Sequence, residues 1–300
     1  MLTLTILGNN SAIPAFGRNP TSQVLQTQEE SYLIDCGEGT QSQLSKYKIK
    51  RSRIRHIFIS HLHGDHYFGL IGLITSMGLL NRIQDLHIHG PALLEDIINI
   101  QLKAADTELP YQIYFHAINE EKIIADTPFI SVKAFRVRHR IDCWGFLFTE
   151  KKNKRKIDAD KLKSYEIPSE FYTNLQKGDD YITAKGTIIP NEEVTFASTP
   201  PRSYAYCSDT IYHEEIIEHI KNADLLYHET TYLKDLEERA AARFHSTTIQ
   251  AAQIARLANA GRLIIGHFSS KYEVLDEFLS EAKEVFEETE LALEGVCFKI

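Results

Sequence analysis

The sequence has few residues that could crosslink it or anchor it in a bilayer. Its 300 residues include only four cysteines, at positions 36, 143, 207 and 297. They are widely spaced and form no CxxC pair, so neither a disulfide scaffold nor a zinc ribbon is expected, and we expect Cys36, Cys143, Cys207 and Cys297 to be reduced packing residues. No run approaches the roughly 20 apolar residues that span a bilayer. Residues 1–7 lack the basic flank of a secretory signal, and a cytoplasmic location is expected.

Basic residues are fewer than acidic ones. The chain has 33 Lys and Arg against 41 Asp and Glu, a net charge of −8, which excludes a protein that coats nucleic acid indiscriminately. Cations gather in two stretches, Lys46 to Arg55 and a denser one made of Lys151, Lys152, Lys154, Arg155, Lys156, Lys161 and Lys163. Such runs are usually solvated faces, so they bear on function only beside a phosphate-cleaving site.

Hydrophobic residues make up 43% of the chain, enough to bury the core of one large domain or two smaller ones. Leu2, Leu4 and Ile6 alternate with threonines, as in a strand with one buried face. Apolar runs predict further strands at 32–34, 57–59, 86–89, 113–115, 130–137, 144–148, 204–207, 225–227, 263–265 and 296–300. Apolar spacings of three and four predict helices at 68–80, 93–102, 214–221 and 247–258 and before the last strand. Two strand-then-helix halves indicate an α/β layered fold with sheets inside and helices outside.

One short segment carries an unusual density of metal-binding side chains. His61, His63, Asp65 and His66 lie within six residues, directly after a predicted strand. In an extended segment His61 and His63 face the same side, and Gly64 permits a tight turn that brings Asp65 and His66 to an adjacent position. Imidazole and carboxylate together suit zinc, with manganese or iron as substitutes. Two neighbouring ion sites follow.

Four ligands cannot complete two sites, so further ligands are needed at later strand ends. His139, Asp209 and His267 each come just after an apolar run, and the two oxygens of Asp209 could bridge both ions. Paired cations roughly 3.5–4 Å apart activate a shared water and favour phosphodiester hydrolysis. The remaining isolated histidines are predicted to be structural: His56, His87, His89, His116, His213 and His219.

The segment HLHGDH at 61–66 resembles the signature of the metallo-β-lactamase superfamily. More narrowly, nearly the whole chain resembles the ribonuclease Z family. The segments that carry this resemblance are DCGEGTQ at 35–41, FGLIGL at 68–73, YCSDT at 206–210, HETT at 228–231 (the family's HEAT), HST at 245–247 and GHFSSKY at 266–272.

This resemblance implies a four-layered αββα sandwich spanning residues 1–300 as one domain, with residues 150–201 as an inserted arm. It implies an endoribonuclease that removes the 3′ trailer of precursor tRNA and leaves a tRNA 3′-hydroxyl and a trailer 5′-phosphate. It also implies a homodimer with two zinc ions per subunit. One ion would be held by His61, His63 and His139, the other by Asp65, His66 and His267, and both by Asp209.

The resemblance also implies acid–base roles for two residues, one of which is a metal ligand as well. Asp65 would accept a proton, and His245, kept basic by Glu229, would protonate the departing 3′ oxygen.

The chain departs from the family pattern where substrate is gripped. Phe16 stands where a lysine is usual, in a loop with Arg18-Asn19 that resembles the family's loop near the tRNA acceptor end. The arm segment 167–172 lacks the Gly-Pro pair of the family's arm tip. Ser208 in the segment 206–210 and Thr230 in the segment 228–231 are milder departures from the family pattern. Two other readings remain: a hydrolase of a small phosphodiester, sulfate ester or lactone on the same fold, and a non-catalytic RNA-binding member, which predicts a decayed ligand set.

Overall fold

The computed structural model describes residues 2–151 and 154–300. They form two compact units, Met1–Thr149 with Arg202–Ile300 as unit 1, and Glu150–Pro201 as unit 2. Lys152 of the second basic stretch lies outside the described residues. No described helix is long and apolar enough to cross a membrane.

Unit 1 contains two seven-stranded sheets. The first has the order β18-β1-β2-β3-β4-β5-β6. Its strands are β1 Thr3–Gly8, β2 Ser22–Gln26, β3 Ser31–Cys36, β4 Ile54–Phe58, β5 Leu86–Gly90, β6 Ile113–Ala117 and β18 Cys297–Lys299. The strands from β3 to β6 run parallel to one another, so their carboxyl ends meet at one edge of the sheet.

The second sheet has the order β17-β16-β15-β14-β9-β8-β7. Its strands are β7 Ile123–Asp126, β8 Ile130–Val137, β9 Cys143–Glu150, β14 Ser203–Cys207, β15 Leu225–Glu229, β16 Leu263–Gly266 and β17 Thr289–Leu291. The strands from β14 to β17 are parallel, and β9 runs antiparallel to β14.

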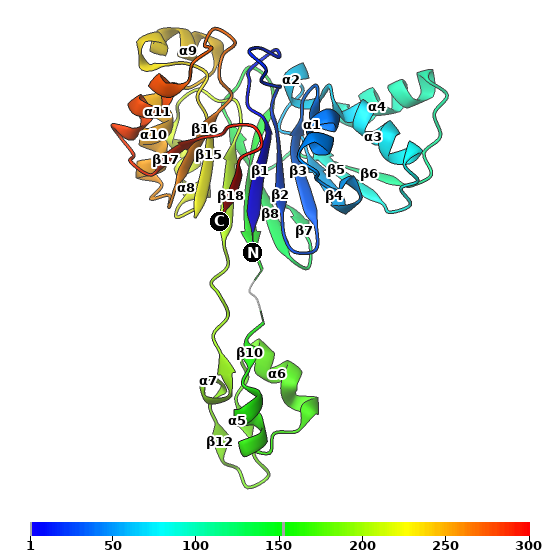
Figure 1. Ribbon diagram of the computed structural model, residues 1–300, viewed down its shortest axis with the longest axis vertical. Coiled ribbons are helices and arrows are strands. Elements are labelled where there is room, and N and C mark those ends of the chain that lie inside the picture. Colours follow the sequence, from blue (N-terminus) through cyan, green and yellow to red (C-terminus); the bar gives the residue numbers. More distant parts are fainter. Residues whose placement is uncertain (1, 152–153) are drawn as a thin grey trace. The chain divides into compact units, whose positions relative to one another are not determined.

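Helices cover the outer face of each sheet (Figure 1). Those beside the first sheet are α1 Thr40–Lys46, η1 Arg51–Arg53, α2 Gly64–Tyr67, α3 Leu70–Leu79 and α4 Leu93–Ala104. Those beside the second are η3 Glu214–Ile216, α8 Ile217–Ile220, η4 Lys234–Leu236, α9 Glu237–Arg243, α10 Thr248–Leu257 and α11 Asp276–Lys283. The result is a four-layered αββα sandwich, which confirms the fold that the family resemblance implied.

Each gap between layers holds its own apolar core. Between the sheets lie Leu4, Phe58 and Trp144, and the first sheet packs through Leu33 and Ile57 on its helices. The second sheet and its helices share residues such as Ala205, Ile254 and Phe278. Because strands buried on both faces need apolar residues throughout, their runs read as continuous rather than alternating. β1 is accordingly buried on both faces, where the sequence pattern predicted one.

Unit 2 is a small folded unit in its own right. Its elements are β10 Lys156–Ile157, α5 Ala159–Ser164, η2 Ser169–Phe171, α6 Tyr172–Lys177, β11 Tyr181–Ile182, β12 Ile188–Ile189, α7 Asn191–Val194 and β13 Thr195–Phe196. Its buried centre consists of Leu162, Ile167, Leu175, Ile189 and Val194. The Asn191 side chain donates to the carbonyls of Leu175 and Asp179, both at 2.8 Å, and so ties α6 to α7.

Three of the four cysteines are buried, as packing residues should be, whereas Cys297 is exposed on β18. No disulfide joins them.

Four histidines that the sequence left as isolated form a cluster on one face of the first sheet. His56 on β4 lies opposite His87 on β5, and His89 lies opposite His116 on β6. Facing rings stack, with centroids 4.9 Å apart for His56 and His87 and 4.5 Å for His89 and His116. Diagonal hydrogen bonds join the stacks, at 3.1 Å between His56 and His89 and 3.0 Å between His87 and His116. The sequence shows these residues as isolated, because cross-strand register cannot be read from the local sequence, and their predicted structural role stays a prediction.

This four-histidine cluster predicts that the protein loses stability in mild acid. Burial, with smaller contributions from neighbouring histidines, lowers the pKa of His56 to about 4 and that of His89 to about 2. An unfolded histidine titrates near about 6.5. As pH falls from about 6.5 toward 4, the unfolded chain therefore binds protons at these histidines whereas the folded chain does not. The free energy of unfolding decreases as a result. For His56 the loss is on the order of 3 kcal/mol.

Thermal unfolding at pH 7 and pH 4.5 measures this loss. The His56→Phe, His89→Phe double variant removes the titrating groups while keeping aromatic rings in the stacks. We expect its melting temperature to fall less between the two pH values than that of the unaltered protein. An equal fall in both proteins contradicts the prediction.

Candidate metal centre and catalytic pocket

The first group of predicted ligands converges from three elements of unit 1. His61 and His63 follow β4, His139 follows β8, and Asp209 follows β14. One ligand atom from each of the four lies within 4.8 Å of the others. His63 Nδ1 is 3.0 Å from His61 Nε2 and 3.1 Å from His139 Nε2, and Asp209 Oδ2 is 3.6 Å from His61 Nε2. These atoms surround one point.

A second group lies directly beside the first. Asp65 and His66 belong to α2, and His267 follows β16. Asp65 Oδ2 is 3.6 Å from His66 Nε2 and 3.4 Å from His267 Nε2. The other oxygen of Asp209, Oδ1, is 3.4 Å from His66 Nε2 and 3.2 Å from His267 Nε2. Asp209 therefore turns one oxygen to each group, which is the geometry of a bridging carboxylate.

Four of the five imidazoles in the two groups are held by a hydrogen bond at the ring nitrogen that faces away from the centre. His61 Nδ1 contacts Ser60 Oγ at 3.0 Å, and His66 Nδ1 contacts Asp35 Oδ2 at 2.7 Å. His139 Nδ1 contacts the Phe244 carbonyl at 2.9 Å, and His267 Nδ1 contacts Thr231 Oγ1 at 3.0 Å. Such outer contacts fix the ring and leave the opposite nitrogen free to bind a metal.

Two buried atoms at the centre have no hydrogen-bond partner among the described residues: His66 Nε2 and Asp209 Oδ1. A buried polar atom without a partner is costly, and a bound cation satisfies both atoms. The nitrogen and oxygen donor set suits zinc, manganese or iron. The residues present therefore fit a pair of divalent cations.

The carboxylates of the centre favour additional positive charge beside them. Burial lowers the pKa of His66, but Asp209, Asp65 and Asp35 outweigh burial and raise it well above its usual value. The pKa of Asp65 is lowered in turn, because His66 and His267 outweigh its burial. Carboxylates that favour a proton on a buried imidazole also favour a divalent cation in its place.

Asp35 is a functional residue to which sequence reasoning gave no role, although its segment was part of the family resemblance. Its buried carboxylate accepts from the Ser60 amide at 2.8 Å and from the Tyr206 hydroxyl at 2.6 Å while it holds His66. Both Asp35 and His267 adopt left-handed backbone, with φ of 53° and 63°. Such strain in non-glycine residues is typical of functional sites. An acidic residue at the buried end of β3 was the available signal.

The turn at Gly64 is built differently from the sequence prediction. Gly64 is the first residue of α2, after the extended N-cap His63, and does not adopt a left-handed conformation. A Cβ atom at Gly64 would lie 2.2 Å from Cε2 of Phe68. A larger residue at position 64 would therefore force the exposed Phe68 ring to move from its place over this backbone.

His245 and Glu229 form an acid–base pair beside the centre. His245 Nδ1 is 3.0 Å from Glu229 Oε1, and Glu229 also accepts from the amides of Thr210, Thr231 and Ser246 at 3.1, 2.9 and 2.9 Å. These donors keep the buried carboxylate charged. Burial lowers the pKa of His245, but the charge and hydrogen bond of Glu229, with Asp209 and Asp65, raise it to about 9. His245 is therefore protonated at neutral pH.

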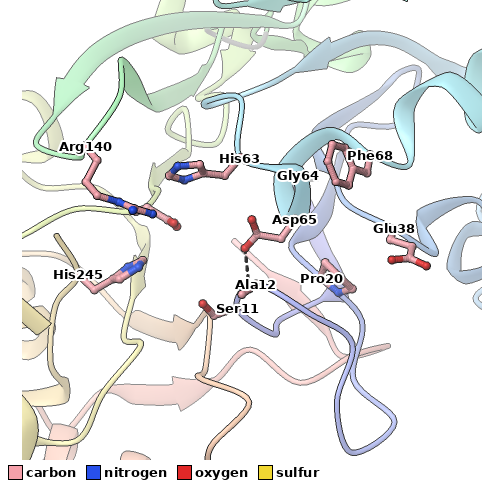
Figure 2. A pocket seen from close by; sticks show the side chains of 11 residues that line it. Ser11, Ala12, Pro20, Glu38, His63, Gly64, Asp65, Phe68, Arg140 and His245 are labelled. Atoms are coloured by element: carbon pink, nitrogen blue, oxygen red, sulfur yellow. Dashed lines mark hydrogen bonds between the residues drawn. The ribbon is translucent and has the colours of Figure 1, made fainter. Parts of the chain in front are cut away.

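An open cavity of about 330 Å³ gives access to these groups. Figure 2 shows Asp65 near its middle, with His63, Arg140 and His245 on one side and Phe68 and Glu38 on the other. The Ala12 amide donates to Asp65 Oδ2 at 2.7 Å, drawn as the dashed line in Figure 2.

Arg18 links two segments of the protein. The Arg18 guanidinium donates to Asn10 Oδ1 at 3.0 Å, to the Glu273 carbonyl at 2.9 Å and to the Tyr272 carbonyl. It therefore joins the amino-terminal loop to the segment after His267. Phe16 is half exposed in the same loop, with Arg18 over its ring.

Comparison with known proteins gives full-length relatives. The chain is 46% identical over 299 residues to ribonuclease Z of Bacteroides thetaiotaomicron, covering 99% of this chain and 95% of the relative. It is 43% identical over 286 residues to ribonuclease Z of Porphyromonas gingivalis, covering 95% and 94%. Residues 2–177 match the family model described as Anti-Pycsar protein Apyc1.

Solved structures agree with the fold. Human tRNase Z, short form, superimposes with a TM-score of 0.74 at 28% identity and covers 99% of both chains. The metallo-β-lactamase fold protein YhfI of Bacillus subtilis gives 0.70 at 20% identity, covering 99% and 98%, which supports the fold alone. The chain therefore belongs to the family that the Anti-Pycsar protein Apyc1 model describes and to the ribonuclease Z family of metallo-β-lactamase-fold proteins.

Proposed function

We propose that this protein is a two-metal endoribonuclease that removes the 3′ trailer from precursor tRNA. The observation that carries the proposal is the combination of a double ligand group bridged by Asp209 with the adjacent His245–Glu229 pair. Full-length relatives named ribonuclease Z support the choice of substrate.

The ligand assignment in this proposal divides the centre into two sites. His61, His63 and His139 would hold one cation, Asp65, His66 and His267 would hold the other, and Asp209 would contribute an oxygen to each. Two zinc ions per subunit suit this donor set, with manganese or iron as substitutes. When bound, the cations activate water and stabilise charge on the phosphate.

The protein's own residues complete the reaction. Asp65, with one oxygen held by the Ala12 amide, accepts the proton of the attacking water. His245 gives its proton to the departing 3′ oxygen of the tRNA, because Glu229 keeps it protonated at neutral pH. The products are a tRNA 3′-hydroxyl and a trailer 5′-phosphate.

Unit 2 acts in this proposal as an exosite that grips precursor tRNA by its phosphates. Lys154, Lys161 and Lys163 are exposed on it, and lysines position a nucleic-acid backbone without reading its sequence. The unit has its own apolar centre, so it presents these cations on a folded surface. We further propose that the protein acts in the cytoplasm as a homodimer, as the family resemblance implies.

Reversing the charge of Lys154, Lys161 and Lys163 with glutamate tests the exosite. We expect KM for precursor tRNA to rise by about tenfold or more, and the dependence of log KM on log salt to become shallower, since each lost phosphate contact removes about 0.7–0.9 from that slope. Cleavage of bis(p-nitrophenyl) phosphate should be unchanged.

The matched control reverses three exposed lysines of unit 1, Lys221, Lys283 and Lys299. An equal loss in the control would show that net charge, and not unit 2, determines binding of precursor tRNA.

The direct test of the function is cleavage of a precursor tRNA by the purified protein, with the product ends mapped. Cut ends at the discriminator nucleotide, with a 5′-phosphate on the trailer, support the proposal. The rival function is hydrolysis of a small phosphodiester, sulfate ester or lactone, which the missing Gly-Pro pair of segment 167–172 favours. Activity on a small diester without any tRNA cleavage would establish that rival.

A further inference from the structure

The cavity beside the metal centre has two chemically different ends. Arg140, His63 and His245 line one end, and Phe68 and Glu38 line the other, on opposite sides of Asp65 in Figure 2. Its volume of about 330 Å³ is at the small end of the roughly 300–1,000 Å³ range of ligand pockets. It has room for one nucleotide beside the reacting phosphate.

Phe68 is an unusual residue to find at the mouth of a polar site. Its side chain is 63% exposed, although burying a phenylalanine is strongly favourable. The ring lies over the backbone of Gly64 and contacts Tyr67 edge-on with centroids 5.0 Å apart. An exposed aromatic face beside the proposed nuclease centre is suited to stack on a nucleobase.

Arg140 supplies the opposite chemistry. Its guanidinium is exposed at the cavity, and no hydrogen bond or ion pair joins it to another described residue, whereas the nearby Arg138 is paired with Glu215 at 2.6 Å. A guanidinium without an internal partner is available for bidentate binding of a phosphate. Glu38 at the other end repels phosphate, so charge alone sends the phosphate to Arg140 and the neutral base to Phe68.

The direction of the RNA strand across the cavity follows from the proposed function, on which this inference rests. His245 serves the departing 3′ oxygen of the tRNA, so the last tRNA nucleotide lies toward His245. The trailer keeps the phosphate and leaves the centre on the other side. Phe68 lies on that other side of Asp65 (Figure 2).

We propose that this cavity is a subsite for the first nucleotide of the trailer, in which Phe68 stacks on the base and Arg140 binds the scissile phosphate. Stacking tolerates any base, so the subsite accepts trailers of any sequence but requires that a base be present. Arg140 acts on the phosphate and is indifferent to the base.

The test uses two precursor tRNAs that differ only in the first trailer nucleotide, which carries a base in one and is abasic in the other. For the unaltered protein we expect removal of the base to lower kcat/KM on the order of tenfold, mainly through KM. Phe68→Ala should show the same loss on the complete substrate and no further loss on the abasic one. Phe68→Trp should restore the preference for the base.

Arg140→Ala should lower kcat/KM equally on both substrates, with Arg140→Lys intermediate. Leu79→Ala, which removes an exposed apolar side chain outside the cavity, is the control and should match the unaltered protein. Metal content and melting temperature check that each variant is folded and loaded.

Three outcomes overturn the subsite. The first is that the unaltered protein cleaves both substrates with the same kcat/KM, and the second is that Phe68→Ala lowers kcat/KM on the abasic substrate as much as on the complete one. The third is that Arg140→Ala lowers kcat/KM on only one of the two substrates. An unaltered protein that cleaves neither precursor tRNA but hydrolyses a small diester overturns the proposed function instead, and the subsite with it.

Discussion

Replacing Asp209 with alanine is expected to abolish cleavage and to empty the metal centre. Its two oxygens face the two ligand groups, at 3.6 Å from His61 Nε2 and 3.2 Å from His267 Nε2. Without this carboxylate both cations lose a ligand, and their mutual repulsion is no longer offset by the charge between them. Activity on precursor tRNA should fall below detection, and metal content should fall below one ion per subunit.

The matched control is Asp142→Ala, which removes an exposed carboxylate paired with Arg136 in the same unit. Surface pairs of this kind contribute little to stability, so metal content and activity should stay unchanged. An Asp209→Ala protein that keeps two ions and measurable activity would rule out a bridging role.

Replacing His245 with alanine should lower kcat on precursor tRNA by about 10²- to 10⁴-fold, the usual contribution of a general acid. Metal content should stay nearly unchanged, because the two proposed ligand groups are complete without His245, although His245 also lies close enough to Asp209 and His267 to form a third group with them. A substrate that releases p-nitrophenolate needs no proton donor and should lose far less activity. Equal losses on both substrates would mean that His245 has another role.

The pH dependence separates the acid from a merely structural histidine. The rate should fall at alkaline pH as His245, whose pKa is raised to about 9 mainly by Glu229 acting against burial, loses its proton. Bound cations offset the charges of Asp209 and Asp65, so Glu229 becomes the main group that holds the proton. Glu229→Gln should therefore move the alkaline limb to lower pH, and an unmoved limb would contradict the pairing.

The sequence predicted those parts of the fold that depend on local pattern. The apolar runs at 57–59, 204–207 and 263–265 fall on β4, β14 and β16, and the helix expected at 93–102 corresponds to α4. It missed β2, whose sequence SQVLQ has three polar residues in five, and α1, whose sequence TQSQLSK has a single apolar residue. β2 is held by its ladders to β1 and β3, and α1 packs against β1 and α3, so their contacts rather than an apolar pattern of their own define them.

The site was predictable to the extent that ligands stand at strand ends. The motif at 61–66 and the polar residues after β8, β14 and β16 are brought together because those strand ends share one edge of the sandwich. Asp35, Ser60 and Thr231 carry outer hydrogen bonds, and of these only Asp35, an acidic residue at the end of a buried strand, had a signal in its local sequence. Arg140 and Phe68 were missed because exposure at a cavity is a property of the folded chain.

The position of the bound metals tests the central claim most directly. Anomalous diffraction from crystals of protein purified without chelator should reveal two peaks roughly 3.5–4 Å apart. One should lie within bonding distance of His61, His63 and His139, the other of Asp65, His66 and His267, with Asp209 contacting both. A single peak, or peaks outside these groups, would contradict the account.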